Sequence, residues 1–386
     1  MRIPARGLTG FNMLWVGQII SVLGTGMNRF ALSIWAWQTT GSATLLAAVM
    51  FVSLGTSLLI SPVAGVMVDR FSRKRLLILA DLAAMCTSGS LLALHAAGRL
   101  EVWHLFVAGA FAGLFESLQA PAFQAAVTTM LPPELYSRAN GRMALLVTLS
   151  DTFAPLLAGY LLAGAGLAGV LTVDLLSFAV SILTLLLVHI PTPAQRATPG
   201  EPFGRKLSAG FRYIFRRPGL VGMLLLLMAV NISVGTYQGL VRPFILSRTG
   251  DNVTLLASVL AAGGVGQVAG ALLLSFWKGP AARIHGLLLG TVLASLRTVF
   301  TGLGDGPLLW YASAGLLGFF IPFVNTFGLS IWQALVEPEV QGQVFAARRM
   351  AGMSTAPVVT LLCGMLSDRV LEPAMGQGGA LVPVFG

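Results

Sequence analysis

Charged and amide side chains interrupt several long apolar stretches of the 386-residue sequence. Gln18 and Arg29 lie eleven positions apart, so they share one stripe of a helix. Asn231, Gln238 and Arg242 form a stripe of the same spacing in a later stretch. Charged groups inside apolar helices usually face a partner or a water-filled cavity. We therefore interpret the polar residues of these stretches as a candidate ligand pathway. The set is Arg29, Glu116, Gln119, Asp151, Asn231, Gln238, Arg242 and Asn325.

The acids and bases of this set suggest different chemistry. An apolar cavity disfavours the charged form of a carboxylate, so Glu116 or Asp151 could bind and release a proton. Arg29 and Arg242 are suited to an anionic or carbonyl-rich group. The alternative for each of these residues is that it pairs inside a helix bundle and holds the helices together.

The composition indicates which elements must position these residues. Hydrophobic residues make up 56% of the chain and charged residues 10%, whereas a soluble domain carries about 25% charged residues. Apolar stretches of the length needed to cross a bilayer, about 20 residues, recur along the chain. The first stretch, 11–37, has no signal-peptide cleavage site after it, and we expect a membrane helix there. The sequence predicts an all-α membrane protein.

Apolar runs predict six helices in the first half and five in the second, separated by a basic stretch. We expect a six-helix bundle over 1–190, a basic cytoplasmic linker over 191–218, and a second bundle over 219–386 from which a twelfth helix is missing. The predicted helices are 11–38, 45–68, 76–96, 103–131, 142–163, 168–190, 219–247, 253–277, 284–303, 308–335 and 346–367.

The basic residues indicate the orientation. Of the 24 Lys and Arg residues, 18 lie at the N-terminus and in the loops after the even-numbered helices, and three lie in the other loops. Because cytoplasmic loops carry the basic excess, the N-terminus is predicted to be cytoplasmic. This alternation also argues against a nucleic-acid surface despite the net charge of +10. Two Cys and four scattered His residues give no metal-ligand spacing, and we expect no metal or cofactor.

The two halves carry similar stretches, FQAAVTTMLPPELYSRANGRM in the first and IWQALVEPEVQGQVFAARRM in the second. Each contains Gln, then Pro and Glu, then Arg and Met. Arg142 and Arg349 lie 207 residues apart, which is the separation expected after duplication of a six-helix unit with its linker. Weak internal symmetry of this kind is typical of transporters.

Between the second and third predicted helices stands GVMVDRFSRKR, Gly65 to Arg75. This stretch resembles the signature loop of the major facilitator superfamily. NRFAL from Asn28, QAPAFQA from Gln119 and RRMAGMS from Arg348 resemble its macrolide-efflux and enterobactin-exporter branch. The resemblance implies a cytoplasmic gate in which Asp69 contacts the start of the eleventh helix, at 346–349. Its gating residues would be Gly65, Asp69, Arg70, Arg73 and Lys74.

The same resemblance implies that helices 1, 4, 7 and 10 line a central cavity, and these helices carry most of the polar stripes. Helices 6 and 9 would be peripheral, which favours a structural role for Asp174 and Arg297. Two departures weaken the likeness to proton-coupled members. Helix 4 carries Glu116 in the region where many of them have an arginine, and helix 5 lacks the full glycine-rich antiporter motif.

We therefore predict a secondary active transporter, acting by proton-coupled efflux of a small amphiphilic compound such as a drug, a macrolide or a siderophore. The alternatives are an importer or symporter on the same fold and a membrane receptor that does not transport. The sequence contains no ATP-binding loop and no catalytic motif, so we expect no enzyme. The partners would be the substrate, H⁺ and the bilayer. We expect a monomer in a bacterial inner membrane.

Overall fold

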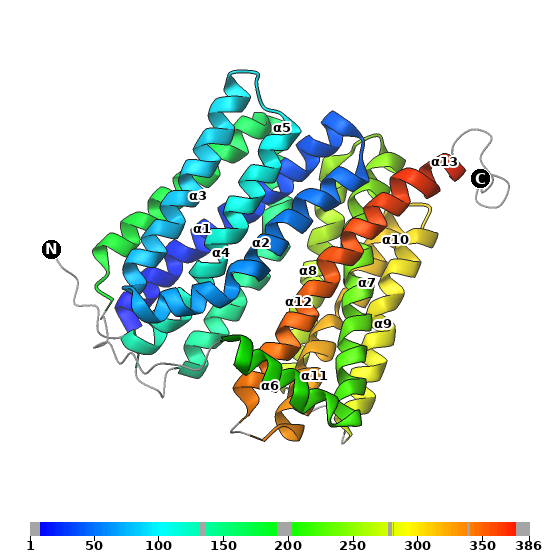
Figure 1. Cartoon of the computed structure of the whole chain (residues 1–386). Coiled ribbons are helices and arrows are strands. Elements are labelled where there is room, and N and C mark those ends of the chain that lie inside the picture. Colours follow the sequence, from blue (N-terminus) through cyan, green and yellow to red (C-terminus); the bar gives the residue numbers. More distant parts are fainter. Residues whose placement is uncertain are drawn as a thin grey trace. The chain divides into compact units, whose positions relative to one another are not determined.

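The computed structural model describes residues 8–131, 136–190, 203–276, 280, 282–337 and 340–375 (Figure 1). Inside these ranges, some helical residues are described by their backbone alone, among them Gly65, Asp69, Arg70 and Asp151. Every regular element in the described residues is a helix. The prediction of an all-α fold is confirmed.

The chain divides into two compact units, and unit 1 comprises Met1–Ala36 and Val52–Gly200. Apolar side chains from the ends of its helices form a buried core, in which Phe11, Leu77 and Leu185 are fully enclosed. The helices that contribute to unit 1 are α1 (Leu8–Thr40), α2 (Ala43–Arg70), α3 (Arg73–Ala96), α4 (Val102–Met130) and α5 (Tyr136–Leu187).

Helix α5 covers two of the predicted helices, 142–163 and 168–190. The chain turns between them at Gly166, whose φ of 63° and ψ of −168° are not helical. Only glycine adopts this backbone region at little cost, because it has no Cβ. A single residue therefore replaces the short loop expected between residues 163 and 168.

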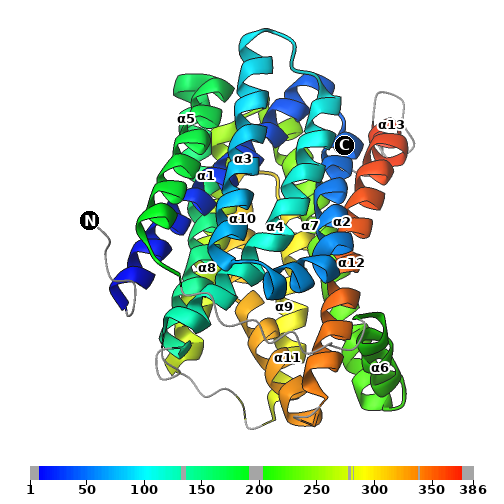
Figure 2. The same cartoon turned by 60° about the vertical axis from the view of Figure 1, so that its left-hand side comes forward.

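Unit 2 comprises Trp37–Phe51 and Glu201–Gly386. In both cartoon views, α12 runs beside α7 (Figures 1 and 2). The predicted helix 308–335 is divided by the π-helical turn η2. The elements of unit 2 are α6 (Phe203–Phe215), α7 (Pro218–Thr249), α8 (Val253–Phe276), α9 (Arg283–Leu303), α10 (Pro307–Ala312), η2 (Ser313–Leu317), α11 (Ile321–Leu335), α12 (Gln341–Leu366), η3 (Ser367–Leu371) and α13 (Glu372–Met375).

Helix α6 adds an element that the sequence analysis did not name. The stretch 191–218 was predicted as a basic linker, with no helix named in it, and 13 of its residues form this helix. Ile214 is fully buried, whereas Arg212 and Phe215 are exposed. The apolar side of α6 packs against α12 and α7 (Figure 2). The many basic residues of the stretch concealed this amphipathic pattern.

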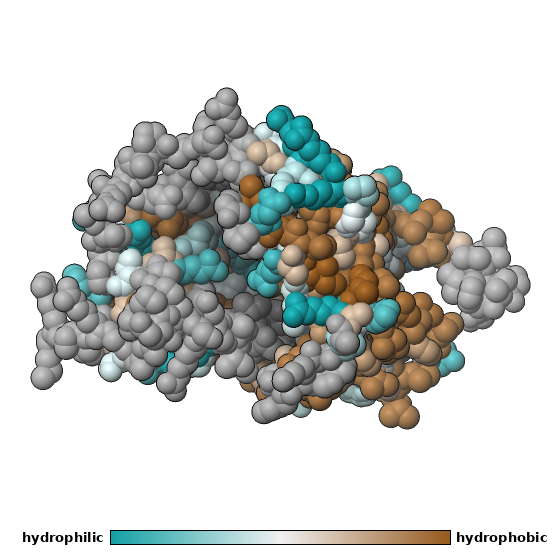
Figure 3. All heavy atoms as spheres, turned by 90° about the horizontal axis from the view of Figure 1, so that it is seen from below, coloured by the Kyte–Doolittle hydropathy of each residue, from teal (hydrophilic) through white to brown (hydrophobic). Residues whose placement is uncertain are grey.

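The described residues contain ten helices that are long and apolar enough to cross a membrane. Because one of them covers the two predicted spans of α5, they correspond to the eleven predicted helices. Large apolar side chains are exposed on both units, among them Leu59 and Leu308. Figure 3 shows apolar side chains over much of the coloured surface on its right-hand side. Such a surface is expected of helices that face lipid.

An acidic side chain caps the start of α2 within unit 2. The Asp368 carboxylate accepts hydrogen bonds from the backbone N–H groups of Ala43 and Thr44, at 3.0 and 2.9 Å, and from Ser42 Oγ at 2.6 Å. These N–H groups belong to the first turn of α2 and have no partner within the helix. A carboxylate also interacts favourably with the positive end of the helix dipole.

Candidate substrate pathway

A cavity of about 300 Å³ lies within unit 2, between α7, α9, α11 and α12. Leu226, Leu227 and Val230 give it an apolar side on α7. Ligand pockets commonly combine such a lining with a few polar groups. The polar lining residues are Asn231, Ser233, Thr291, Ser295, Arg297, Asn325 and Arg348.

The two arginines of this cavity rest on aromatic rings. The guanidinium carbon of Arg297 lies 3.7 Å from the ring centroid of Tyr237, and that of Arg348 lies 5.6 Å from the ring centroid of Trp332. Arg297 is only 8% exposed. The Nε atoms of both arginines are buried without a hydrogen-bond partner. In the described part of the chain, no carboxylate forms an ion pair with either of them.

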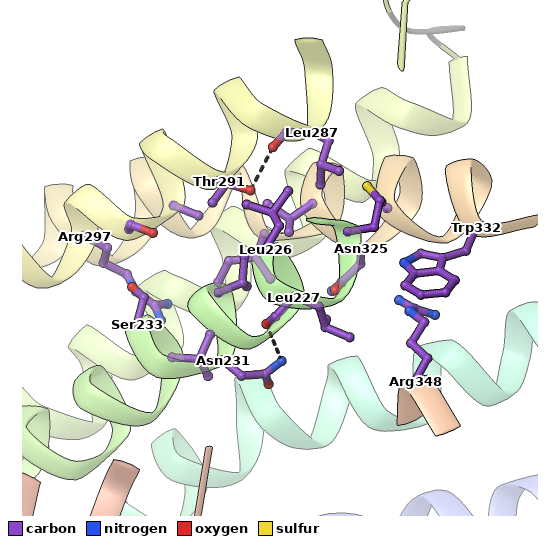
Figure 4. A pocket seen from close by; sticks show the side chains of 18 residues that line it. Leu226, Leu227, Asn231, Ser233, Leu287, Thr291, Arg297, Asn325, Trp332 and Arg348 are labelled. Carbon is purple, nitrogen blue, oxygen red and sulfur yellow. Dashed lines mark hydrogen bonds between the residues drawn. The ribbon is translucent and has the colours of Figure 1, made fainter. Parts of the chain in front are cut away.

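Two of the predicted pathway residues line this cavity, Asn231 and Asn325. Asn231 donates from Nδ2 to the carbonyl oxygen of Leu227 at 2.8 Å, one turn earlier in α7 (Figure 4). Gln238 and Arg242, predicted on the same stripe, are not among the lining residues. Gln238 is exposed, and Arg242 donates to its carbonyl oxygen at 3.4 Å. Of the predicted stripe on α7, only Asn231 therefore lines the cavity.

In unit 1, the structure brings two predicted pathway residues together. Arg29 of α1 forms an ion pair with Glu116 of α4. The side chains are 59% and 35% exposed, so the pair is open to its surroundings. This geometry matches the alternative in which the residues pair within the bundle. It leaves an accessible carboxylate whose negative charge is balanced by its neighbour.

A second predicted residue of α4, Gln119, belongs to a buried network. Its Nε2 donates to Asp81 at 2.9 Å and to Gln18 Oε1 at 3.3 Å. Ser181 of α5 donates to the same carboxylate at 2.7 Å and accepts a hydrogen bond from Gln18 at 2.9 Å. Asp81 is fully buried. The network joins four helices, α1, α3, α4 and α5, through neutral donors.

A similar arrangement surrounds Asp174 of α5. Its Oδ2 accepts hydrogen bonds from Ser88 of α3 and Asn28 of α1, each at 2.6 Å. Oδ1 of Asp174 and Oδ1 of Asn28 are buried without a partner. Among the described residues, Arg29 attracts the Asp174 carboxylate electrostatically, but its ion pair is with Glu116.

The two networks are related by helix geometry. Asp81 and Ser88 are two turns apart on α3, and Asp174 and Ser181 are two turns apart on α5. Because one helix advances by seven residues as the other recedes by seven, each aspartate meets the serine of the other helix. The two helices are therefore cross-linked twice by the same kind of hydrogen bond.

Close approach of α1 makes the second network possible. A Cβ added at Gly24 would lie 2.2 Å from Ser177 Oγ and 3.0 Å from Asp174 Oδ1. No side chain fits at that position without displacing α5. Gly24 is thus required by packing, although the sequence around it gives no helix-breaking signal.

The predicted gating loop is only partly described. Lys74 donates to the carbonyl oxygens of Leu186 and Val188, at 3.0 and 2.7 Å, and so binds the C-terminal end of α5. Cations are favoured at helix C-termini. Arg73 is half-buried. Gly65, Asp69, Arg70 and Asp151 are described by their backbone alone, so the Asp69 contact stays a prediction.

Sequence reasoning missed several residues of these sites. Asp81 was overlooked, although an acid inside an apolar helix is itself a signal. Arg297 was assigned to a peripheral structural position, whereas it lines the cavity. Arg348 was noted only within a motif. Its position over Trp332 depends on how α11 and α12 pack, which no local pattern reveals.

Two helical units whose helices are long and apolar enough to cross a membrane, and which carry polar groups within those helices, are typical of a membrane transporter. The sequence matches the Major Facilitator Superfamily over residues 14–369, and the chain belongs to this family. It is 23% identical to macrolide efflux protein A of Streptococcus pyogenes, over 93% of this chain and 90% of that protein. It is 30% identical to the enterobactin exporter EntS of Shigella flexneri, over 58% of this chain and 54% of that protein.

The fold resembles solved transporters at low sequence identity. A nucleoside transporter, NupG, superposes with a TM-score of 0.72 at 15% identity, covering 96% of this chain and 93% of that one. A bacterial homologue of ferroportin superposes with a TM-score of 0.64 at 17% identity, covering 93% of this chain and 92% of that one. The chain is a multi-pass membrane transporter and not an enzyme.

Proposed function

We propose that this transporter exports a small amphiphilic compound from the cytoplasm by alternating access, driven by protons. The cavity of unit 2 carries the proposal, because it combines an apolar wall with asparagine, serine and arginine side chains. The efflux activity in the names of its relatives supports the outward direction. The basic loops support a cytoplasmic N-terminus and a place in the bacterial plasma membrane.

The candidate pathway residues have separate roles in this proposal. Asn231 and Asn325 would contact substrate in unit 2, and Arg29, Glu116 and Gln119 would do so in unit 1. Arg242 and Gln238 would act on the exposed part of α7. Asp69 with its basic neighbours would close the cytoplasmic side. Glu116 or Asp151 would carry the proton.

The function is tested with everted membrane vesicles, in which an exporter accumulates its substrate. A macrolide and a catecholate siderophore are offered with and without an imposed pH gradient. We expect gradient-dependent accumulation of at least one compound, abolished by a protonophore and absent from vesicles without the protein. Accumulation only in right-side-out vesicles would indicate an importer instead. Uptake that survives collapse of the gradient would contradict proton coupling.

The proton carrier is tested separately with Glu116→Gln and Asp151→Asn. We expect one of these variants to bind substrate but to lose gradient-driven accumulation. If both variants accumulate substrate as the unchanged protein does and remain sensitive to the protonophore, neither carboxylate carries the proton.

A further inference from the structure

The cavity of unit 2 contains two positive charges and no negative one among its lining residues. Arg297 reaches from α9 toward Ser233 on α7, and Arg348 lies at the other end beside Trp332 (Figure 4). Leu226, Leu227 and Asn325 lie between them in this view. The cavity therefore presents an apolar middle with a cation at each end.

The arginines are held in place by contacts that do not neutralise them. Stacking on Tyr237 and Trp332 attracts a guanidinium to the ring face and leaves its formal charge unchanged. Nε of Arg297 has no hydrogen-bond partner, although the residue is more than nine-tenths buried. A buried cation without a counter-ion in a membrane protein is expected to serve a ligand or an ion.

We propose that the cavity is selective for amphiphiles with an anionic group, such as a carboxylate, sulfonate or catecholate, on an apolar body. This rests on the proposed export function and specifies its substrate class. Arg297 binds the anionic group, because a guanidinium offers several N–H donors in one plane to paired oxygens. Leu226 and Leu227 contact the apolar body.

Arg348 serves as the outer contact for the same group. It lies near the start of α12, whereas Arg297 lies in the second half of α9. The predicted topology puts the beginnings of both helices on the cytoplasmic side. A substrate that enters from the cytoplasm would thus meet Arg348 first and Arg297 deeper in the membrane.

A matched pair of probes tests the charge preference. 1-Anilinonaphthalene-8-sulfonate is anionic, and N-phenyl-1-naphthylamine has the same rings without a charge. Binding of each is measured by fluorescence titration of the full chain in lipid nanodiscs, with empty nanodiscs subtracted. We expect the anionic probe to bind about tenfold more tightly, which corresponds to one charge-assisted hydrogen bond. Equal affinities would overturn the proposal.

Variants separate recognition from a structural role. Arg297→Gln is expected to weaken binding of the anionic probe about tenfold and of the neutral probe less than about twofold. Arg297→Lys should retain part of the preference, because it keeps the charge but lacks the planar set of donors. Arg283→Gln, at an exposed position of the same helix, is the control and should change neither. An equal loss for both probes in Arg297→Gln would mean that the arginine only maintains the fold, and would overturn the proposal.

Arg348→Gln provides a second measurement if Arg297→Gln does not fold. It should lower the affinity for the anionic probe and leave that for the neutral probe unchanged. An unchanged preference in this variant would overturn the role of Arg348. Binding in nanodiscs needs no gradient. If the unchanged protein prefers the anionic probe in nanodiscs but accumulates no compound in vesicles, the export function is contradicted and the charge preference stands. If vesicles accumulate both probes at equal rates, the charge preference is contradicted and the export function stands.

Discussion

Unit 1 and unit 2 place charge in the membrane in opposite ways. In unit 1, the buried carboxylates of Asp81 and Asp174 accept hydrogen bonds from serine and amide groups. In unit 2, Arg297 and Arg348 stack on rings and have Nε atoms without partners. Although Oδ1 of Asp174 also has no partner, both carboxylates are tied to neighbouring helices by side-chain hydrogen bonds, whereas no side-chain hydrogen bond or ion pair ties either arginine to another helix among the described residues. Hydrogen bonds between helices stabilise the fold, and a cation held by ring contacts remains available to a ligand. We therefore infer that the two aspartates cross-link the helices of unit 1 and that the two arginines bind a ligand in unit 2.

The largest expected effect is on Asp174. Asp174→Ala removes the acceptor for two buried donors, Ser88 Oγ and Asn28 Nδ2, and should lower the free energy of unfolding by about 3 kcal/mol. Reversible unfolding in SDS measures this change. Asp305→Ala, at a side chain that is 97% exposed, is the control and should change it by less than about 0.5 kcal/mol.

Asp174→Asn sharpens the same result. An amide oxygen can still accept from Ser88 and Asn28, so this variant should keep most of the stability that Asp174→Ala loses. If Asp174→Asn and Asp174→Ala lower the free energy of unfolding equally, the fold needs the negative charge of the carboxylate. The hydrogen bonds from Ser88 and Asn28 would then not explain the contribution of Asp174 to stability.

A somewhat smaller effect is expected at Gly24. Gly24→Ala places a methyl group against Ser177 and Asp174 and should cost about 2 kcal/mol of unfolding free energy, since tightly packed helices must move apart. Gly55→Ala on α2 meets no atom within 4 Å and should be neutral or slightly stabilising. The same SDS titration compares the two. Equal behaviour would show that α1 and α5 are not closely packed at this point.

Lys74 should have a smaller effect still. Lys74→Met removes two hydrogen bonds to carbonyl oxygens at the end of α5 and should destabilise unit 1 by about 1 kcal/mol. Arg75→Met, at the next and exposed position, serves as the control. Thermal unfolding in detergent, followed by tryptophan fluorescence, distinguishes them. A larger effect at Arg75 would contradict the capping role.

The smallest effect on stability is expected at Arg297, although its effect on binding is large. Arg297→Met replaces an uncompensated cation by an apolar side chain of similar length, and such replacements are often neutral. The unfolding free energy should change by less than about 1 kcal/mol, while binding of the anionic probe falls. A loss of about 3 kcal/mol would place Arg297 with the structural groups of unit 1 and remove the contrast between the units.

Much of the fold could be predicted from the sequence, because lipid restricts membrane spans to apolar helices. The predicted spans recur in the structure, and the family follows from the loop at Gly65 to Arg75. The break at Gly166 lies between the predicted helices 142–163 and 168–190, where a short loop was expected. Helix α6 was not named because the arginines and the lysine of its stretch indicated only a basic linker. Of the candidate pathway, Asn231 and Asn325 reach the cavity of unit 2.

The sequence by itself determined where the long apolar helices of the described residues lie, since this depends on local composition. Only the tertiary structure decided which polar groups meet. Asp81 and Ser181 are 100 residues apart in the chain, and Arg297 and Tyr237 are likewise distant. A charged residue has the same local pattern whether it is paired or open to a ligand. The difference arises from the register in which the helices pack.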